Sequence, residues 1–308
     1  MKKIFINLKR FDVPREMGGI CDLTNPKKWI ENIVEKSIEL GLGKLEGFQI
    51  VYMIPESLII TANEKLKSYA SEDRASLKIG SQSVYKDDIK KGGNFGAFTT
   101  KLPAAAASNM GCKDTIIAHS EERKGILEIL SMFEPELKNS QALREKAART
   151  VDEIVNKEVL NAMDQGMDVL FCIGETEEER GEGNFEEQQK RIKKVLKSQI
   201  ENGLSGTEKY TGKQSVVIGY EPIWAIGPGK TPPGKEYIAY VSKLIKELTK
   251  EIFGYELEVV YGGGLKEENA EMISSIDTID GGLVALTKFT GDIGFYVEDL
   301  KIIIEKYI

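Results

Sequence analysis

The chain has 308 residues, of which 41% are apolar, enough to build a full core in one large domain or in two small ones. Its formal net charge of −7 argues against a nucleic-acid-binding protein, which usually carries a basic face. An anionic ligand would need local positive groups, because the overall field repels it.

The cysteine and histidine content argues against a metal site. Cys21, Cys112 and Cys172 show no CxxC spacing, and the chain has a single histidine. We therefore expect no metal and no cofactor. The chain begins MKKIFINLKRFD, without the long apolar region of a secretion signal, and no apolar run approaches the length of a membrane span. These features predict a reduced, cytoplasmic protein.

Residues 3–9 form the first predicted strand, with an apolar centre. Asn7 and Lys9 lie two residues apart, so a continuous strand places both side chains on one face. An amide and an ammonium group at the end of a buried strand suit the site of a phosphorylated sugar. The alternative is a capping asparagine and a solvated lysine, and the residues alone leave both interpretations open.

The next segments alternate between helix and strand. A helical pattern covers 26–40, a strand is expected at 48–54, and Pro55 suits the first position of a second helix. A third strand is expected at 77–84. Residues 85–98, YKDDIKKGGNFGAF, then form a loop rich in glycine and lysine that is longer than most strand–helix connections.

The fourth predicted strand, 114–118, ends at His119, the only histidine of the chain. A lone histidine is usually a structural, hydrogen-bonded group. Its place at a strand end and before a helix favours a functional role instead. A helix N-terminus disfavours the imidazolium, so we expect a neutral ring.

Residues 140–165 predict a charged helix that extends the helical layer, and 167–173 predict the fifth strand. Thr176 and Glu179 then have the spacing of a capping box. The helix that they open is interrupted near 181–183, where glycine recurs. Its many charges are most simply explained as a solvated face.

Residues 216–231, VVIGYEPIWAIGPGKT, contain the candidate base. An apolar strand ends at Glu221, a stiff segment follows at 222–224, and a glycine-rich tip leads to ordered chain at 230–231. A carboxylate at a strand end before such a loop is the layout of a catalytic base under a closing lid, whose tip Pro228 would stiffen. The alternative is a surface acid before a turn.

The remaining pattern completes a ring. A helix is expected at 232–253, strands at 257–261 and 279–285, and a last helix at 297–306. Eight strands alternating with helices predict an α/β protein, a (β/α)8 TIM barrel in a single domain over residues 1–308. It would carry a longer loop at 85–98 and an extra helical segment at 140–165.

Six short segments share one further property: each lies at a strand end or in an adjoining loop. They are NLK at 7–9, GAFTTKL at 96–102, HSEER at 119–123, CIGET at 172–176, YEPIWAIGPGK at 220–230 and YGG at 261–263. In this order they resemble the triosephosphate isomerase family. Each segment alone is a weak signal, but six in family order indicate the barrel and its ancestry.

The resemblance implies an isomerase, an intramolecular oxidoreductase that interconverts glyceraldehyde 3-phosphate and dihydroxyacetone phosphate through an enediolate, in glycolysis and gluconeogenesis. Glu221 would move the proton, His119 and Lys9 would stabilise the oxyanion, and Asn7 would orient the oxygen. The loop around Phe98 and Thr99 resembles one that inserts into a partner subunit, which implies a homodimer. Substrate or phosphate binding would fall to Gly227, Gly263, Gly264, Ala285, Leu286 and Lys288, and supporting or lid roles to Glu121, Trp224, Lys230, Thr231 and Tyr261.

The chain also departs from the family pattern. Leu8 replaces an aromatic residue, Thr100 and Lys101 replace a Gly-Glu pair, and Gly264 replaces a serine. The most serious change is Ala285-Leu286 in place of two glycines, because Leu286 does not readily allow close approach of the backbone to a phosphate. Two alternatives follow: the same mechanism on another short ketose phosphate, such as a four-carbon one, or a non-catalytic sugar-phosphate-binding barrel. Retention of the candidate base with its two partners argues against the second.

Overall fold

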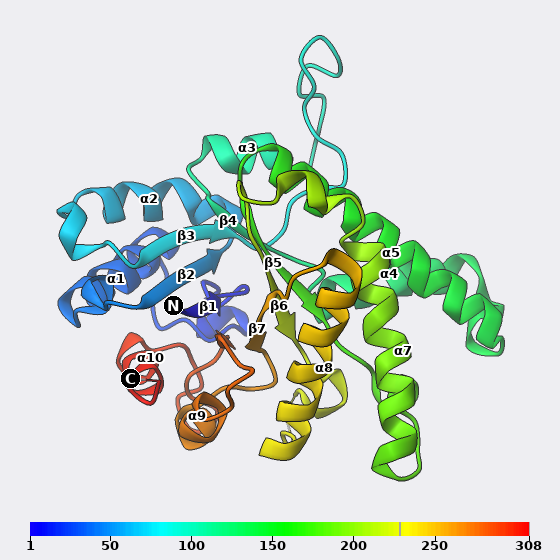
Figure 1. Cartoon of the computed structure of the whole chain (residues 1–308). Helices are drawn as coiled ribbons and strands as arrows, with labels where there is room; N and C mark the ends of the chain where they lie inside the picture. Colours follow the sequence, from blue (N-terminus) through cyan, green and yellow to red (C-terminus); the bar gives the residue numbers. More distant parts are fainter. Residues whose placement is uncertain (228, 308) are drawn as a thin grey trace.

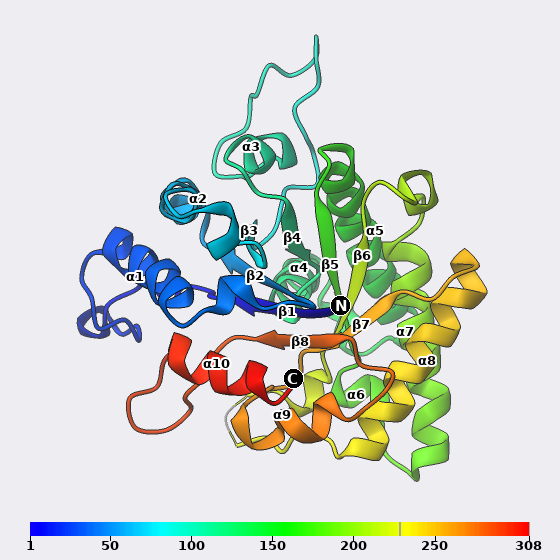
Figure 2. The same ribbon diagram turned by 60° about the vertical axis from the view of Figure 1, so that its left-hand side comes forward.

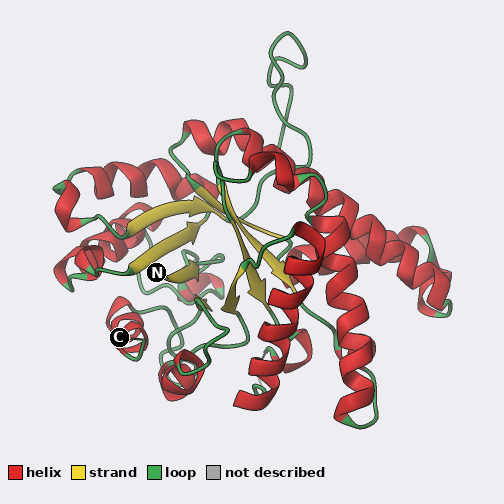
Figure 3. Ribbon diagram, viewed as in Figure 1, coloured by secondary structure: helices red, strands yellow, loops and turns green. Residues whose placement is uncertain are grey.

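A computed structural model describes residues 1–227 and 229–307. Eight parallel strands pair in sequence order and close into a barrel, with helices packed around the outside (Figures 1 and 3). The predicted fold is therefore confirmed. The strands are β1 (Lys2–Asn7), β2 (Phe48–Ile54), β3 (Leu77–Ser81), β4 (Asp114–Ile117), β5 (Asp168–Ile173), β6 (Val216–Tyr220), β7 (Glu258–Tyr261) and β8 (Gly281–Val284).

The barrel holds two layers of core because each strand buries both of its faces. Outward side chains such as Ile4 and Ile50 pack under the helices, and inward ones such as Phe5 and Val51 fill the barrel. β8 closes the ring beside β1 (Figure 2). A Cβ atom on Gly281 would lie 1.8 Å from the carbonyl oxygen of Lys3, so this closure requires glycine.

Helices follow the strands, and most of them point an apolar stripe inward. They are α1 (Pro26–Glu39), α2 (Ile59–Lys67), α3 (Ala104–Asn109), α4 (Ser120–Phe133), α5 (Gln141–Asp164), α6 (Glu177–Arg180), α7 (Phe185–Gly203), α8 (Lys235–Phe253), α9 (Glu267–Ser274) and α10 (Val297–Glu305). α4 is an exception, since it buries none of its residues and leaves Ile129, Met132 and Phe133 exposed. None of the helices in the described part of the chain is both long and apolar enough to cross a membrane.

Several element ends differ from the sequence prediction. β3 stops at Ser81 rather than continuing to residue 84, and β8 is shorter than expected at both ends. The turn after Pro55 is a 3₁₀ helix before α2 begins. α8 begins at Lys235 because Gly234 adopts the extended backbone of an N-cap.

The chain between β3 and α3 forms a loop that projects well beyond the barrel (Figures 1 and 2). Phe95, near its tip, is 88% exposed, and Thr99 is also exposed. Phe98 packs edge-on against Tyr85 at the base of the loop, with ring centres 5.9 Å apart. The loop therefore presents apolar surface that the rest of the described chain does not cover.

Candidate active site

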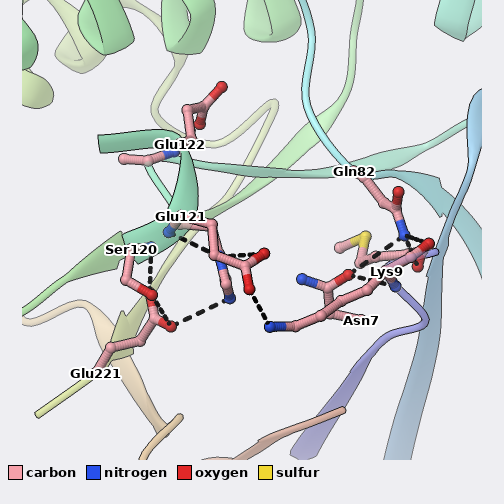
Figure 4. Close-up of polar contacts among 10 residues, drawn as sticks. Asn7, Lys9, Gln82, Ser120, Glu121, Glu122 and Glu221 are labelled. Carbon is pink, nitrogen blue, oxygen red and sulfur yellow. Dashed lines mark hydrogen bonds and ion pairs between the residues drawn. The ribbon is translucent and has the colours of Figure 1, made fainter. Parts of the chain in front are cut away.

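The candidate catalytic residues meet at the C-terminal ends of three strands, where barrel enzymes build their sites. Asn7 is the last residue of β1, His119 follows β4, and Glu221 follows β6. Asn7 and Glu221 lie far apart in the sequence, yet Figure 4 shows their side chains on either side of the same space.

Glu221 is only 3% exposed, and the start of α4 holds its carboxylate (Figure 4). The Ser120 backbone N–H donates to Oε2 at 3.0 Å, and the Ser120 hydroxyl donates to Oε1 at 3.1 Å. His119 Nε2 lies 3.2 Å from the same Oε1. The Ser120 N–H and the helix dipole stabilise a negative charge here, so the buried carboxylate keeps hydrogen-bond partners.

A backbone hydrogen bond to Nδ1 orients the ring of His119. His119 is the N-cap of α4, and its Nδ1 accepts a hydrogen bond from the Glu121 backbone N–H at 3.3 Å. A ring nitrogen that accepts a hydrogen bond carries no proton, which places the proton on Nε2. In this arrangement Nε2 is the nitrogen that faces Glu221 and can donate to it.

Lys9 adopts an unusual backbone. β1 ends at Asn7, so the prediction of a strand through Lys9 was wrong, and Lys9 instead has a φ of 41°. Positive φ is strained for a residue other than glycine and needs local support. The Asn7 side-chain oxygen accepts from the Lys9 backbone N–H at 3.0 Å, and Gln82 Nε2 donates to the Lys9 carbonyl at 2.9 Å. The Lys9 ammonium then reaches Glu121 Oε1 at 2.7 Å.

Sequence reasoning missed three residues of this arrangement. Gln82 supports both Asn7 and Lys9, Ser120 supplies two donors to the candidate base, and Gly262 lets β7 approach it. A Cβ atom on Gly262 would lie 3.2 Å from the Glu221 side chain. Gln82 gave no signal because the predicted strand extended past it to residue 84, and the other two gave none beyond the motifs that contain them.

The segment expected to form the lid begins with a 3₁₀ turn, Ile223–Ala225. The Trp224 indole N–H donates to Glu175 Oε1 at 2.8 Å, and Lys230 Nζ lies 3.3 Å from Glu177 Oε2. Neither contact involves Glu221. Gly227 has a φ of 117°, which suits glycine, and Thr231 is exposed. Pro228, expected to stiffen the tip, lies outside the described residues.

The expected phosphate side is built by the loops after β7 and β8. Tyr261 is fully buried and its hydroxyl donates to the Gly263 carbonyl at 2.9 Å. Gly264 has a φ of 85°, which favours glycine over a residue with a side chain. Neither the Gly263 nor the Gly264 N–H donates to a protein acceptor within the described chain.

After β8 the chain turns back on itself in a hairpin. The N–H groups of Thr287 and Lys288 both donate to the Gly294 carbonyl at 3.1 Å, so these two amides are occupied. Those of Ala285 and Leu286 find no protein acceptor among the residues described. Lys288 is exposed, with its ammonium 5.7 Å from the ring centre of Tyr296.

Direct contacts thus link Asn7, Lys9, His119, Glu121 and Glu221 into one group. Within residues 1–227 and 229–307, no hydrogen bond or ion pair ties the lid or the two phosphate-side loops to that group. What the group offers chemically is a buried carboxylate, an imidazole N–H donor and an ammonium. Such a set suits proton transfer next to a carbonyl whose oxygen becomes negative.

Comparisons with known proteins show the family and the fold. The family model described as triosephosphate isomerase matches residues 30–292. A triosephosphate isomerase of Chloroherpeton thalassium is 34% identical over 215 residues, 69% of this chain and 71% of that protein. One of Dictyoglomus thermophilum is 29% identical over 257 residues, 82% of this chain and 86% of the relative. The solved structure of triosephosphate isomerase from Bartonella henselae is similar in fold, with a TM-score of 0.66 at 22% identity over 99% of this chain and 98% of that one.

Proposed function

The chain belongs to the triosephosphate isomerase family and is an isomerase, and we propose that it interconverts glyceraldehyde 3-phosphate and dihydroxyacetone phosphate. In this proposal Glu221 removes a proton from the carbon beside the substrate carbonyl. It returns the proton to the neighbouring carbon. The intermediate is an enediolate, and no electron donor or acceptor outside the substrate is required.

The residues around Glu221 would share the remaining work. The negative charge that develops on the substrate oxygen would be stabilised by the Nε2–H of His119 and the ammonium of Lys9. The Asn7 side-chain oxygen is engaged by Lys9 and Gln82, which leaves its amide N–H groups to orient the substrate. Glu221 must first leave the Ser120 donors, because they occupy the oxygens that would accept the proton.

One observation carries the proposal: His119 Nε2 lies 3.2 Å from the Glu221 carboxylate, and Nδ1 accepts from the Glu121 N–H. A proton donor and a proton acceptor are thus placed side by side in a largely buried site. A simple binding protein has no need for a buried base in contact with a neutral imidazole. This is why we favour catalysis over a non-catalytic sugar-phosphate-binding role.

We assign the phosphate group to the free backbone N–H groups of Gly263, Gly264, Ala285 and Leu286, with Gly227 from the lid. A second candidate is the same reaction on a longer ketose phosphate. It is favoured by the side chain of Leu286 and by the hairpin that presents Lys288 to solvent, since both alter the loop after β8. The overall negative charge makes such local donors necessary.

We also propose that the protein is a homodimer that works in the cytoplasm. The projecting loop around Phe98 and Thr99 would insert into the second copy, which would cover its exposed apolar tip.

The test is turnover of purified protein on glyceraldehyde 3-phosphate beside a panel of tetrose and pentose phosphates. We expect isomerisation of the triose phosphate, abolished to near background in Glu221→Gln. Turnover of a tetrose phosphate alone would favour the second candidate. Binding of these compounds without any turnover would contradict the proposed enzyme.

A further inference from the structure

A buried carboxylate beside the lid accepts three hydrogen bonds on one oxygen. Glu175, two residues after β5, has no exposed surface. Its Oε1 accepts from the hydroxyl of Tyr220 at 2.9 Å, the indole of Trp224 at 2.8 Å and the hydroxyl of Tyr237 at 2.8 Å. Its Oε2 accepts from no group in the described chain.

The three donors come from positions that frame the lid. Tyr220 ends β6 immediately before Glu221, Trp224 lies in the turn that starts the lid, and Tyr237 lies in the first turn of α8, after the lid. The start and the end of the lid therefore converge on a single oxygen atom. Trp224 lies within the expected hinge, residues 222–224, so we expect a rotation of the lid there to change the contact between the indole and Glu175.

Tyr237 also touches the indole directly. Its ring packs edge-on against Trp224, with centres 5.4 Å apart, and Phe185 packs against its other side at the same separation. The Arg180 guanidinium lies over the indole, 3.8 Å from the ring centre. Tyr237 is thus held by packing as well as by its hydroxyl, so the hydroxyl can be removed without emptying the space.

Three donors are more than one carboxylate oxygen can accept with good hydrogen-bond geometry. A carboxylate oxygen offers about two good acceptor directions, so a third donor shares rather than adds a full bond. When one donor leaves, the other two strengthen, and the buried charge remains solvated. Burial raises the pKa of Glu175, and the Tyr237 hydroxyl is first among the groups that oppose this rise.

We propose that Tyr237 is a positioning residue of the lid: its hydroxyl competes with Trp224 for Glu175, and this competition weakens the contact that holds the lid in the observed position. The inference rests on the lid role assigned to residues 225–229. Without the Tyr237 hydroxyl, the bond from Trp224 should become stronger. The lid should then close less readily over a bound anion.

The first test needs no ligand. In a Trp29→Phe background Trp224 is the only tryptophan. Tyr237→Phe should lower quenching of its emission by acrylamide, because the indole is held more tightly. The matched control is Tyr240→Phe, on the same helix and also packed against Phe185 but without a bond to Glu175; it should change nothing. Greater quenching in Tyr237→Phe would mean that Tyr237 merely supports the indole, and unchanged quenching would mean that it does not act on it; either result overturns the proposal.

The second test uses 2-phosphoglycolate as the probe. Tyr237→Phe should raise its dissociation constant about twofold to tenfold, the range expected for one hydrogen bond, and should raise KM more than it lowers kcat. In Trp224→Phe the contested contact is gone, so adding Tyr237→Phe should have no further effect on affinity, measured by calorimetry. Additive effects would overturn the competition. If turnover is absent but the quenching result holds, the proposed reaction fails and the role of Tyr237 stands.

Discussion

Glu122, in the first turn of α4, and Glu158, a buried residue of α5, hold their carboxyl groups next to each other. Glu122 accepts from the Ser83 hydroxyl at 2.6 Å and from the Ala118 N–H at 2.7 Å, while Glu158 Oε2 has no partner in the described chain. Burial, followed by the charge of Glu122, raises the pKa of Glu158 far above its ordinary value. The pair therefore keeps a proton at neutral pH, since two charges this close in the interior are costly.

This pair predicts how stability varies with pH. The folded protein binds a proton at Glu158 that the unfolded chain releases above its ordinary pKa of 4.5, so stability should fall as pH rises above that value. Glu158→Gln should remove this dependence and raise the free energy of unfolding at pH 7 by about 1–3 kcal/mol. Urea unfolding between pH 5 and 9 measures both effects.

The control for this experiment is Glu153→Gln. Glu153 is an exposed carboxylate on α5, the helix that also carries Glu158, and this variant should follow the wild-type curve. If Glu158→Gln instead runs parallel to wild type at every pH, Glu158 is ionised in the folded protein.

A second prediction concerns the candidate base. Glu221→Gln retains an oxygen for the Ser120 donors but cannot accept the substrate proton, so kcat should fall about a thousandfold or more while inhibitor affinity changes little. Glu221→Asp keeps the charge but withdraws it by one methylene, and it should also lower kcat by orders of magnitude. Steady-state kinetics and binding of 2-phosphoglycolate separate the two quantities. A near-normal kcat in Glu221→Gln would remove Glu221 from proton transfer.

The barrel and the strand-end positions of His119 and Glu221 could be predicted because they depend on local patterns. Apolar runs mark strands, and parallel strands in a closed barrel bring their C-terminal ends together. The burial of Glu221 and its hydrogen bonds from Ser120 could not be predicted, because they depend on how β4 and β6 are placed relative to each other.

The prediction failed where a single backbone angle decides the geometry. Alternation along β1 would have put Asn7 and Lys9 on one face, but Lys9 leaves the strand with a positive φ. Tertiary hydrogen bonds from Gln82 support that angle, and no local pattern encodes them. The cluster on Glu175 was missed for the same reason: Tyr220, Trp224 and Tyr237 meet only in the folded chain.

The third prediction tests the homodimer. Thr99 is exposed at the projecting loop, so Thr99→Arg should leave the fold of one subunit intact while placing charge and bulk in the proposed contact. Sedimentation should show a dimer for wild type and a monomer for this variant. Thr211→Arg, at an exposed position before β6 at the opposite end of the barrel, is the control and should remain dimeric. A wild-type monomer would contradict the proposed assembly.

The last prediction concerns substrate choice. Leu286 places a branched side chain beside the N–H groups assigned to the phosphate, and a displacement of about 1 Å can cost roughly a hundredfold in rate. We therefore expect kcat/KM for glyceraldehyde 3-phosphate well below the diffusion limit of about 10⁸ M⁻¹s⁻¹, or a preference for another ketose phosphate. Replacing Ala285 and Leu286 with glycine should raise triose phosphate turnover if the anion binds at these amides. The Thr287 and Lys288 amides are already bonded to the Gly294 carbonyl, so at this position the anion would have to be held by the Lys288 ammonium. Lys288→Ala should raise KM if it is. A wild-type kcat/KM at the diffusion limit would show that the natural Ala285 and Leu286 do not reduce activity on glyceraldehyde 3-phosphate.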